Sequence, residues 1–199
     1  MHFLPDTLEE DAAGERYWPD GFKQVIREEI PRALYSNFNE QSLGQIYKGK
    51  FSAKYRAKYP DLKSFIEQVI GLVVIGAENG ADQGFDGIFK SFMKESALPE
   101  AKPYARHLWP YIFSGPFKEK IHQAIVQEYK RDKSLQYAYQ VGYAAKYGGF
   151  AEFIDEMAWR IEAGIESGVD DVLAKIYRSF RAKGGLPQGR RRPKRLKEW

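Results

Sequence analysis

Hydrophobic residues recur at intervals of three and four along nearly the whole chain, while alternating runs rich in Val, Ile or Thr are missing. The first pattern is typical of amphipathic helices, and the second would have indicated strands. The most apolar stretch spans 62–77, where hydrophobic side chains occupy most sides of a helix. We therefore predict an all-α fold with this helix at the centre of its core.

Proline and glycine divide the helical pattern. Pro60 predicts a boundary, because the residue before a proline avoids the helical conformation, and Asp61 can then cap the next helix. We expect Gly148 and Gly149 to end a tyrosine-rich helix that begins near Ser134.

Three further glycines are expected to interrupt helices. Gly80 and Gly84 should loosen the stretch after 62–77, and Gly168 should separate the last two helices. The chain has 199 residues, of which 43% are hydrophobic, so it can bury a sizeable core. A compact bundle of about seven to nine helices is the simplest architecture for this pattern.

Charge is distributed unevenly along the chain. The net charge is +4, yet residues 181–199 carry eight Lys or Arg and one Glu, which leaves 23 basic and 26 acidic residues before them. Glycine and proline in this last segment oppose a helix. We predict a loosely ordered arm at 1–18, one helical domain at 19–183 and a flexible, disordered basic tail at 184–199.

Cellular location can be inferred only by exclusion. The chain has no cysteine, which is typical of reducing compartments. The first residues lack a basic segment followed by an apolar run, and no apolar stretch reaches the roughly 20 residues that a bilayer-spanning helix needs. We expect a cytoplasmic protein with no membrane association.

The segment 41–60 is the strongest candidate for function, because it holds five basic residues and no acid. If it is helical, Tyr47, Phe51, Tyr55 and Tyr59 form one stripe, with lysines in the adjacent stripe. Aromatic rings beside cations are what stacking on bases and contacting phosphates require. An ordinary amphipathic helix would also bury such a stripe and extend lysines beside it.

The same residues can be interpreted as a helix-turn-helix. In this interpretation 40–48 is the first helix, Gly49 lies in the turn, and 53–59 is a recognition helix. The nucleic-acid contacts would come from Lys48, Lys50, Ser52, Lys54, Arg56 and Lys58. The tail would add sequence-independent, salt-sensitive phosphate contacts from Arg190, Arg191, Arg192, Lys194, Arg195 and Lys197. The first hypothesis is thus a nonenzymatic protein that binds DNA or RNA.

A second hypothesis is a protein-interaction module, an adaptor or inhibitor of a larger complex. Its surface would use aromatic residues that exceed the needs of a small core, and its basic tail would bind an acidic protein partner. These aromatic residues are Tyr137, Tyr139, Tyr143, Tyr147, Trp109, Tyr111 and Phe113. A tyrosine-rich core with hydroxyl groups at its rim is the simpler explanation of these residues.

A third hypothesis is a metal-dependent helical hydrolase. Glu78, Asp82 and Asp86 are spaced to share a helix face, and Glu152, Asp155 and Glu156 form a second acidic group. The glycines around the first group and the solvated appearance of the second oppose this hypothesis. The three histidines, His2, His107 and His122, are scattered, and neither a phosphate-binding glycine loop nor a serine elbow is present. We expect no catalytic residue, no metal and no cofactor.

Overall fold

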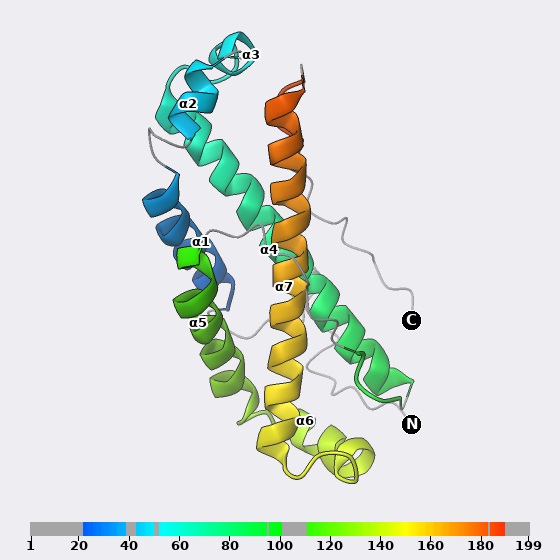
Figure 1. Cartoon of the computed structure of the whole chain (residues 1–199). Helices are drawn as coiled ribbons and strands as arrows, with labels where there is room; N and C mark the ends of the chain where they lie inside the picture. The colour runs from blue at the N-terminus through cyan, green and yellow to red at the C-terminus, as the bar shows by residue number, and fades with distance from the viewer. Residues whose placement is uncertain are drawn as a thin grey trace.

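The computed structural model describes residues 22–38, 43–49, 52–94, 96–100, 111–182 and 184–189. Within these ranges the chain forms helices and no strand, so the prediction of an all-α bundle is confirmed (Figure 1). In chain order they are α1 (Phe22–Asn37), α2 (Leu43–Lys48), α3 (Ser52–Arg56), α4 (Leu62–Met93), α5 (Tyr111–Tyr129), α6 (Lys133–Ala138), the short π-helix η2 (Tyr139–Tyr143) and α7 (Phe150–Arg181).

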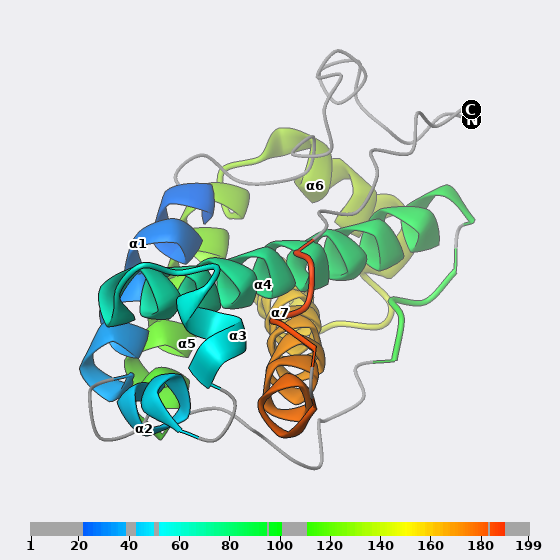
Figure 2. The same ribbon diagram turned by 90° about the horizontal axis from the view of Figure 1, so that it is seen from above.

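Two helices of 32 residues each, α4 and α7, cross at the middle of the molecule (Figures 1 and 2). Their glycines meet at the crossing. A Cβ atom added at Gly76 would lie 2.6 Å from the carbonyl oxygen of Gly168, and one added at Gly80 would collide with the carbonyl oxygen of Gly164. Glycine is needed here because two backbones approach each other closely.

The predicted interruptions at Gly80, Gly84 and Gly168 are therefore wrong, because α4 and α7 run through all three positions as continuous helices. The predicted central helix 62–77 is the first half of α4, and its apolar residues are in the core. Burial against a partner helix outweighs the low helix propensity of glycine.

Helices α1 and α5 lie on one side of this crossing and pack against each other and against the long helices (Figure 1). The buried face of α1 repeats every four residues through Phe22, Ile26, Ile30 and Leu34. Helix α5 contributes a matching buried face at Phe117, Ile121, Ile125 and Tyr129. The four helices therefore share one hydrophobic core.

Short helices cover the two ends of the molecule. At one end α2 and α3 lie near the start of α4 and the end of α7, and at the other α6 and η2 lie near the start of α7 (Figure 1). The boundary predicted at Pro60 is confirmed, but the tyrosine-rich helix ends at Tyr143, five residues before Gly148, and not at the two glycines. Asp61 caps α4 by accepting a hydrogen bond from the Ser64 amide at 2.7 Å, and α7 begins at Phe150, directly after Gly149.

The predicted arm, 1–18, and residues 190–199 of the predicted tail lie outside the described residues. The first part of that tail, 184–189, is described and runs along α4. Leu186 is only 8% exposed, and a Cβ atom added at Gly189 would lie within 3 Å of the side chains of Leu72 and Ile75. Among the described helices, none combines the length and apolar character that crossing a bilayer requires.

Candidate nucleic-acid interface

Helix α3 is attached to the C-terminus of α7. The Lys54 ammonium group donates a 2.6 Å hydrogen bond to the carbonyl oxygen of Ser179 and another to that of Ala182, and the Tyr55 hydroxyl donates to Ser179 at 3.2 Å. The last carbonyls of a helix lack partners within the helix and carry partial negative charge. Lys54 therefore completes the end of α7, and its predicted role as a phosphate contact competes with partners inside the protein.

The other predicted contacts divide into two groups. Lys48, Arg56 and Lys58 are exposed at this end of the molecule. Lys50, the side chain of Ser52 and the predicted tail contacts Arg190, Arg191, Arg192, Lys194, Arg195 and Lys197 lie outside what the structure describes. The exposed group thus comes from α2, from the end of α3 and from the turn that follows it.

The predicted recognition helix, 53–59, is shorter than expected, because α3 ends at Arg56. The chain turns at once, with the Lys58 and Tyr59 amides both donating to the carbonyl oxygen of Tyr55. Pro60 supplies the physical reason, since it disfavours a helical conformation at the preceding residue. Five helical residues are less than two turns.

Much of the predicted aromatic stripe is core. Tyr47 and Tyr55 are buried, Tyr59 is partly buried, and Phe51 lies outside the described residues. The three tyrosine rings surround the buried Phe65, with ring centres 5.5, 4.8 and 5.7 Å from it. The Tyr47 hydroxyl also donates to the carbonyl oxygen of Tyr59 at 2.7 Å. Tyr47 and Tyr55 cannot stack on a base, as the amphipathic-helix interpretation implied.

Helix α7 adds cations that the sequence did not place in the site. Its last turns, 174–182, carry Lys175, Arg178 and Arg181 and no acid, and all three are exposed. In the sequence, cations in the last turn of a helix are explained by the helix dipole. The contacts of Lys54 with Ser179 and Ala182 show that these cations lie beside α3. We call Lys48, Arg56, Lys58, Lys175, Arg178 and Arg181 the basic end.

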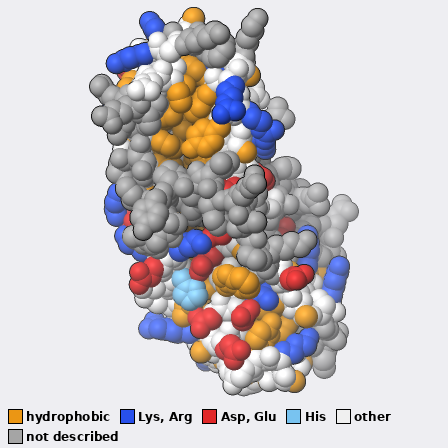
Figure 3. All heavy atoms as spheres, in the orientation of Figure 1, with side chains coloured by type: hydrophobic (Ala, Val, Ile, Leu, Met, Phe, Trp, Pro, Cys, Tyr) orange, Lys and Arg blue, Asp and Glu red, His pale blue; other side chains and the backbone are white. Residues whose placement is uncertain are grey.

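Figure 3 shows this region in the upper half of the view, where Lys and Arg side chains lie at the margins of a hydrophobic patch. At this end Tyr177 of α7 is 36% exposed, and its ring centre lies 6.0 Å from that of the partly buried Phe180. The acids close in sequence to the basic end include the exposed Asp171, four residues before Lys175, and Asp61 and Glu67 at the start of α4. Asp61 caps α4, which lowers the pKa of its carboxyl through the hydrogen bond from Ser64, and Glu67 lies 3.9 Å from Lys63.

Three ion pairs join helices elsewhere in the molecule. Arg27 of α1 contacts Glu78 of α4 at 2.6 Å, Lys120 of α5 contacts Glu29 of α1 at 2.8 Å, and Lys118 of α5 pairs with the buried Glu166 of α7. These pairs hold the helices together and neutralise one another. In the part of the chain that the structure describes, Lys48, Lys58 and Arg181 form no such pair.

The predicted metal ligands do not form a centre. Glu78 is buried against Arg27, whereas Asp82 and Asp86 are partly exposed. His122 bridges two α7 carboxylates with different ring nitrogens, Nδ1 to Glu162 at 2.7 Å and Nε2 to Asp155 at 3.2 Å, so the three groups do not converge on one point. Burial is the main cause that raises the pKa of Glu162. Among the described residues no group of three His, Asp or Glu side chains could hold a metal ion.

The tyrosines of the predicted interaction surface are mostly core. Tyr143 is buried, and Tyr139 and Tyr147 are partly buried around Phe153 at 4.9–5.7 Å between ring centres. Two of their hydroxyl groups donate to backbone: Tyr143 to the Ser96 carbonyl oxygen at 2.8 Å and Tyr139 to that of Tyr147 at 3.2 Å. Burial raises the pKa of Tyr143.

Only part of that surface is exposed. Tyr137 is 53% exposed, whereas Trp109 and the side chains of Tyr111 and Phe113 lie outside the described residues. The basic end, by comparison, gathers six exposed cations. No protein-family model, no curated protein and no solved structure matches this chain.

Proposed function

We propose that this protein binds nucleic acid, DNA or RNA, through its basic end, without acting as an enzyme. One observation carries the proposal: Lys54 attaches the acid-free segment 43–60 to the acid-free last turns of α7. Cations that are far apart in sequence thereby share one end of the molecule. Lysine and arginine that replace phosphate counterions supply most of the affinity in sequence-independent binding.

The structure changes which residues are proposed to touch phosphate. Lys48 and Lys58 keep the role that the sequence indicates, and Arg178 and Arg181 join them because all four are exposed at the basic end. Lys54 is reassigned to holding α3 on α7. Beyond the docked segment 184–189, the cations from Arg190 to Lys197 would add further contacts.

Fluorescence anisotropy with labelled oligonucleotides tests this proposal. The full chain should bind at about 50 mM salt and lose affinity steeply towards about 200 mM. The variant Arg178→Glu/Arg181→Glu should bind more weakly and with a smaller salt slope, reduced by about one unit for each phosphate that the protein no longer neutralises. Lys130→Glu/Arg131→Glu, on residues at the opposite end, is the matched control.

The tail is tested separately by ending the chain after Gly189, which retains the buried Leu186. This truncation should lower the affinity and the salt slope while leaving the melting temperature unchanged. Absence of binding at low salt, or equal decreases in affinity in the control and in the arginine variant, would refute the proposal.

A second candidate function is a protein-interaction module, as the aromatic content predicted. Tyr137 and Val141 are each more than half exposed and lie four residues apart across α6 and η2, so they form one apolar face. This candidate predicts a defined protein partner whose binding weakens with Tyr137→Ser/Val141→Ser and is unchanged by the arginine variant. Binding that depends on the arginines alone would exclude this face.

A further inference from the structure

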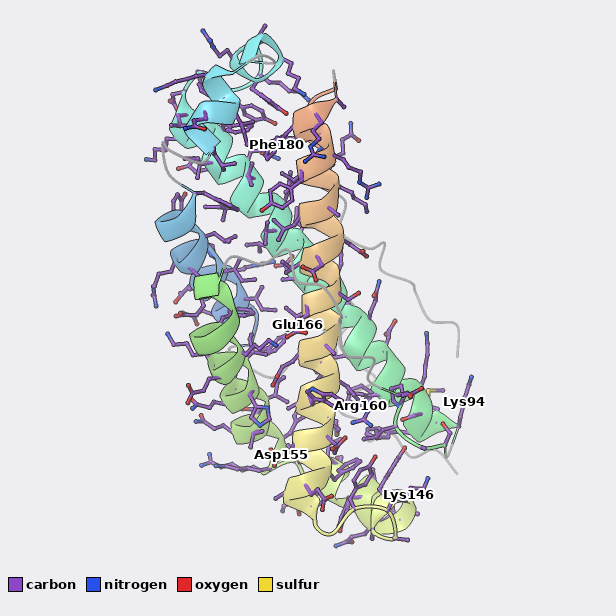
Figure 4. All side chains as sticks on the ribbon, viewed as in Figure 1. Lys94, Lys146, Asp155, Arg160, Glu166 and Phe180 are labelled. Atoms are coloured by element: carbon purple, nitrogen blue, oxygen red, sulfur yellow. The ribbon has the colours of Figure 1, made fainter. Side chains whose placement is uncertain are left out.

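Tyr177 is an exposed aromatic ring at the basic end. It lies on α7 one helical turn before Arg181, so the ring and the guanidinium group occupy neighbouring positions on the helix surface. Its ring centre is 6.0 Å from that of Phe180. Figure 4 shows Phe180 extending from α7 towards α4. Tyr177 therefore forms the outer edge of an aromatic cluster.

Buried residues support this cluster from beneath. The Phe180 ring lies 6.2 Å from Tyr55 and 6.3 Å from Phe65, and both of these side chains are fully buried. The hydrogen bond from the Tyr55 hydroxyl to the backbone of α7 fixes the arrangement. The Tyr177 ring is thus backed by packed side chains, and a ligand that lies on it would order few additional groups.

The charges around the ring favour an anionic ligand with flat apolar parts. Figure 3 shows Lys and Arg at the margins of the hydrophobic patch, and the last turns of α7 carry no acid. Burial raises the pKa of Tyr177, so its phenol stays neutral and adds no charge that would repel phosphate. Nucleic acid combines both properties, since bases stack on aromatic rings while phosphates contact cations.

Single-stranded nucleic acid fits this surface better than a duplex. Base faces are hidden inside a duplex, and sequence-reading proteins reach base edges by placing a helix in the major groove. Helix α3 is only five residues long, and its Tyr55 is buried. A single strand instead exposes its base faces to an aromatic platform.

We infer that the basic end recognises single-stranded nucleic acid, with a base stacked on Tyr177 and adjacent phosphates held by Arg181 and its neighbouring cations. This inference rests on the proposed function and names its substrate class. Oligothymidylate and oligouridylate of about twenty nucleotides, longer than common single-strand site sizes, are suitable probes beside a duplex of equal length. The two single strands distinguish DNA from RNA.

The full-length chain is compared with three variants. Tyr177→Ala should weaken single-strand binding by about tenfold, the effect of removing one stacked base, and leave duplex binding unchanged. Tyr177→Phe should retain the wild-type affinity because the ring remains. Trp159→Ala, on a ring that is 45% exposed eighteen residues earlier in α7, is the control. The salt slope should be the same in all four proteins, since stacking involves no counterion release.

The outcomes separate this inference from the proposal beneath it. Salt-dependent binding in which Tyr177→Ala equals the wild type, or in which the duplex binds as tightly as the single strands, overturns the stacking role and leaves the basic end as a phosphate-binding surface. A decrease in affinity in Tyr177→Phe equal to that in Tyr177→Ala also overturns it. No binding of any probe at low salt removes both proposals together.

Discussion

Alanine substitutions at two glycines of α4 should change the free energy of unfolding in opposite directions. At Gly80 an added Cβ atom would collide with the backbone of Gly164 on α7, whereas at Gly71 it would meet no atom within 4 Å. Both residues lie inside the same helix, so the change in helix propensity is matched between the two variants. The two positions differ in their contact with α7, which is close at Gly80 and absent within 4 Å at Gly71.

The magnitudes follow from two effects. Replacing glycine by alanine inside a helix stabilises it by about 0.8–1 kcal/mol, which is the full expected effect at Gly71. Overpacking a close contact costs about 1–3 kcal/mol, with the high end expected at Gly80 because the colliding atoms belong to backbone that cannot rotate away. Gly80→Ala should therefore be destabilising by about 1–2 kcal/mol, and the two variants should differ by about 2–3 kcal/mol.

Urea unfolding followed by far-ultraviolet circular dichroism measures this difference. At this chain length each kcal/mol shifts the melting temperature by about 2–4 °C, so thermal melts provide a second measurement. The denaturant dependence should be similar in both variants, because they expose similar surface on unfolding. Equal effects of the two substitutions would refute the close approach of α4 and α7 at Gly80.

Three other substitutions test contacts described above. Lys54→Met should lower the free energy of unfolding by about 1–2 kcal/mol in urea titrations, because the Ala182 carbonyl oxygen loses the lysine donor and that of Ser179 keeps only the Tyr55 hydroxyl and the Ala182 amide. Lys58→Met should have little effect. Asp61→Ala should lower the melting temperature at neutral pH. The pKa of the Asp61 carboxyl is depressed in the folded state, so the difference in melting temperature from the wild type should disappear as the pH falls through that pKa. Arg27→Met, which removes the guanidinium group that contacts the buried Glu78, should destabilise more than Arg27→Met/Glu78→Gln in the same urea titrations.

Features that depend on local sequence were predictable. The all-α class follows from the spacing of apolar residues, and the boundary at Pro60 follows from the conformation that proline imposes on the residue before it. The role of Gly80 and Gly168 inside continuous helices could not be predicted from local sequence. Whether a glycine breaks a helix or permits a close crossing depends on a second helix far away in the chain, and a single sequence carries no signal for that partner.

The candidate site shows the same division. The acid-free run of lysines in 41–60 was visible in the sequence, and so was the alternative that its tyrosines are core. The part played by α7 was not, because Lys54 meets the Ser179 carbonyl oxygen 125 residues further along the chain. A second acid-free run, 174–182, was the available signal, but its cations fitted the end of a helix equally well.

Lys54 therefore decides between the two interpretations of its segment. If its ammonium group contacts phosphate, Lys54→Met should lower the salt slope of binding by about one unit. If it caps α7, the salt slope should remain and the stability should fall, because the hydrogen bonds to Ser179 and Ala182 are removed. The geometry supports the second outcome. A cation that is held by the protein's own carbonyls positions the basic end, and the exposed Lys58 and Arg181 beside it remain available to a ligand.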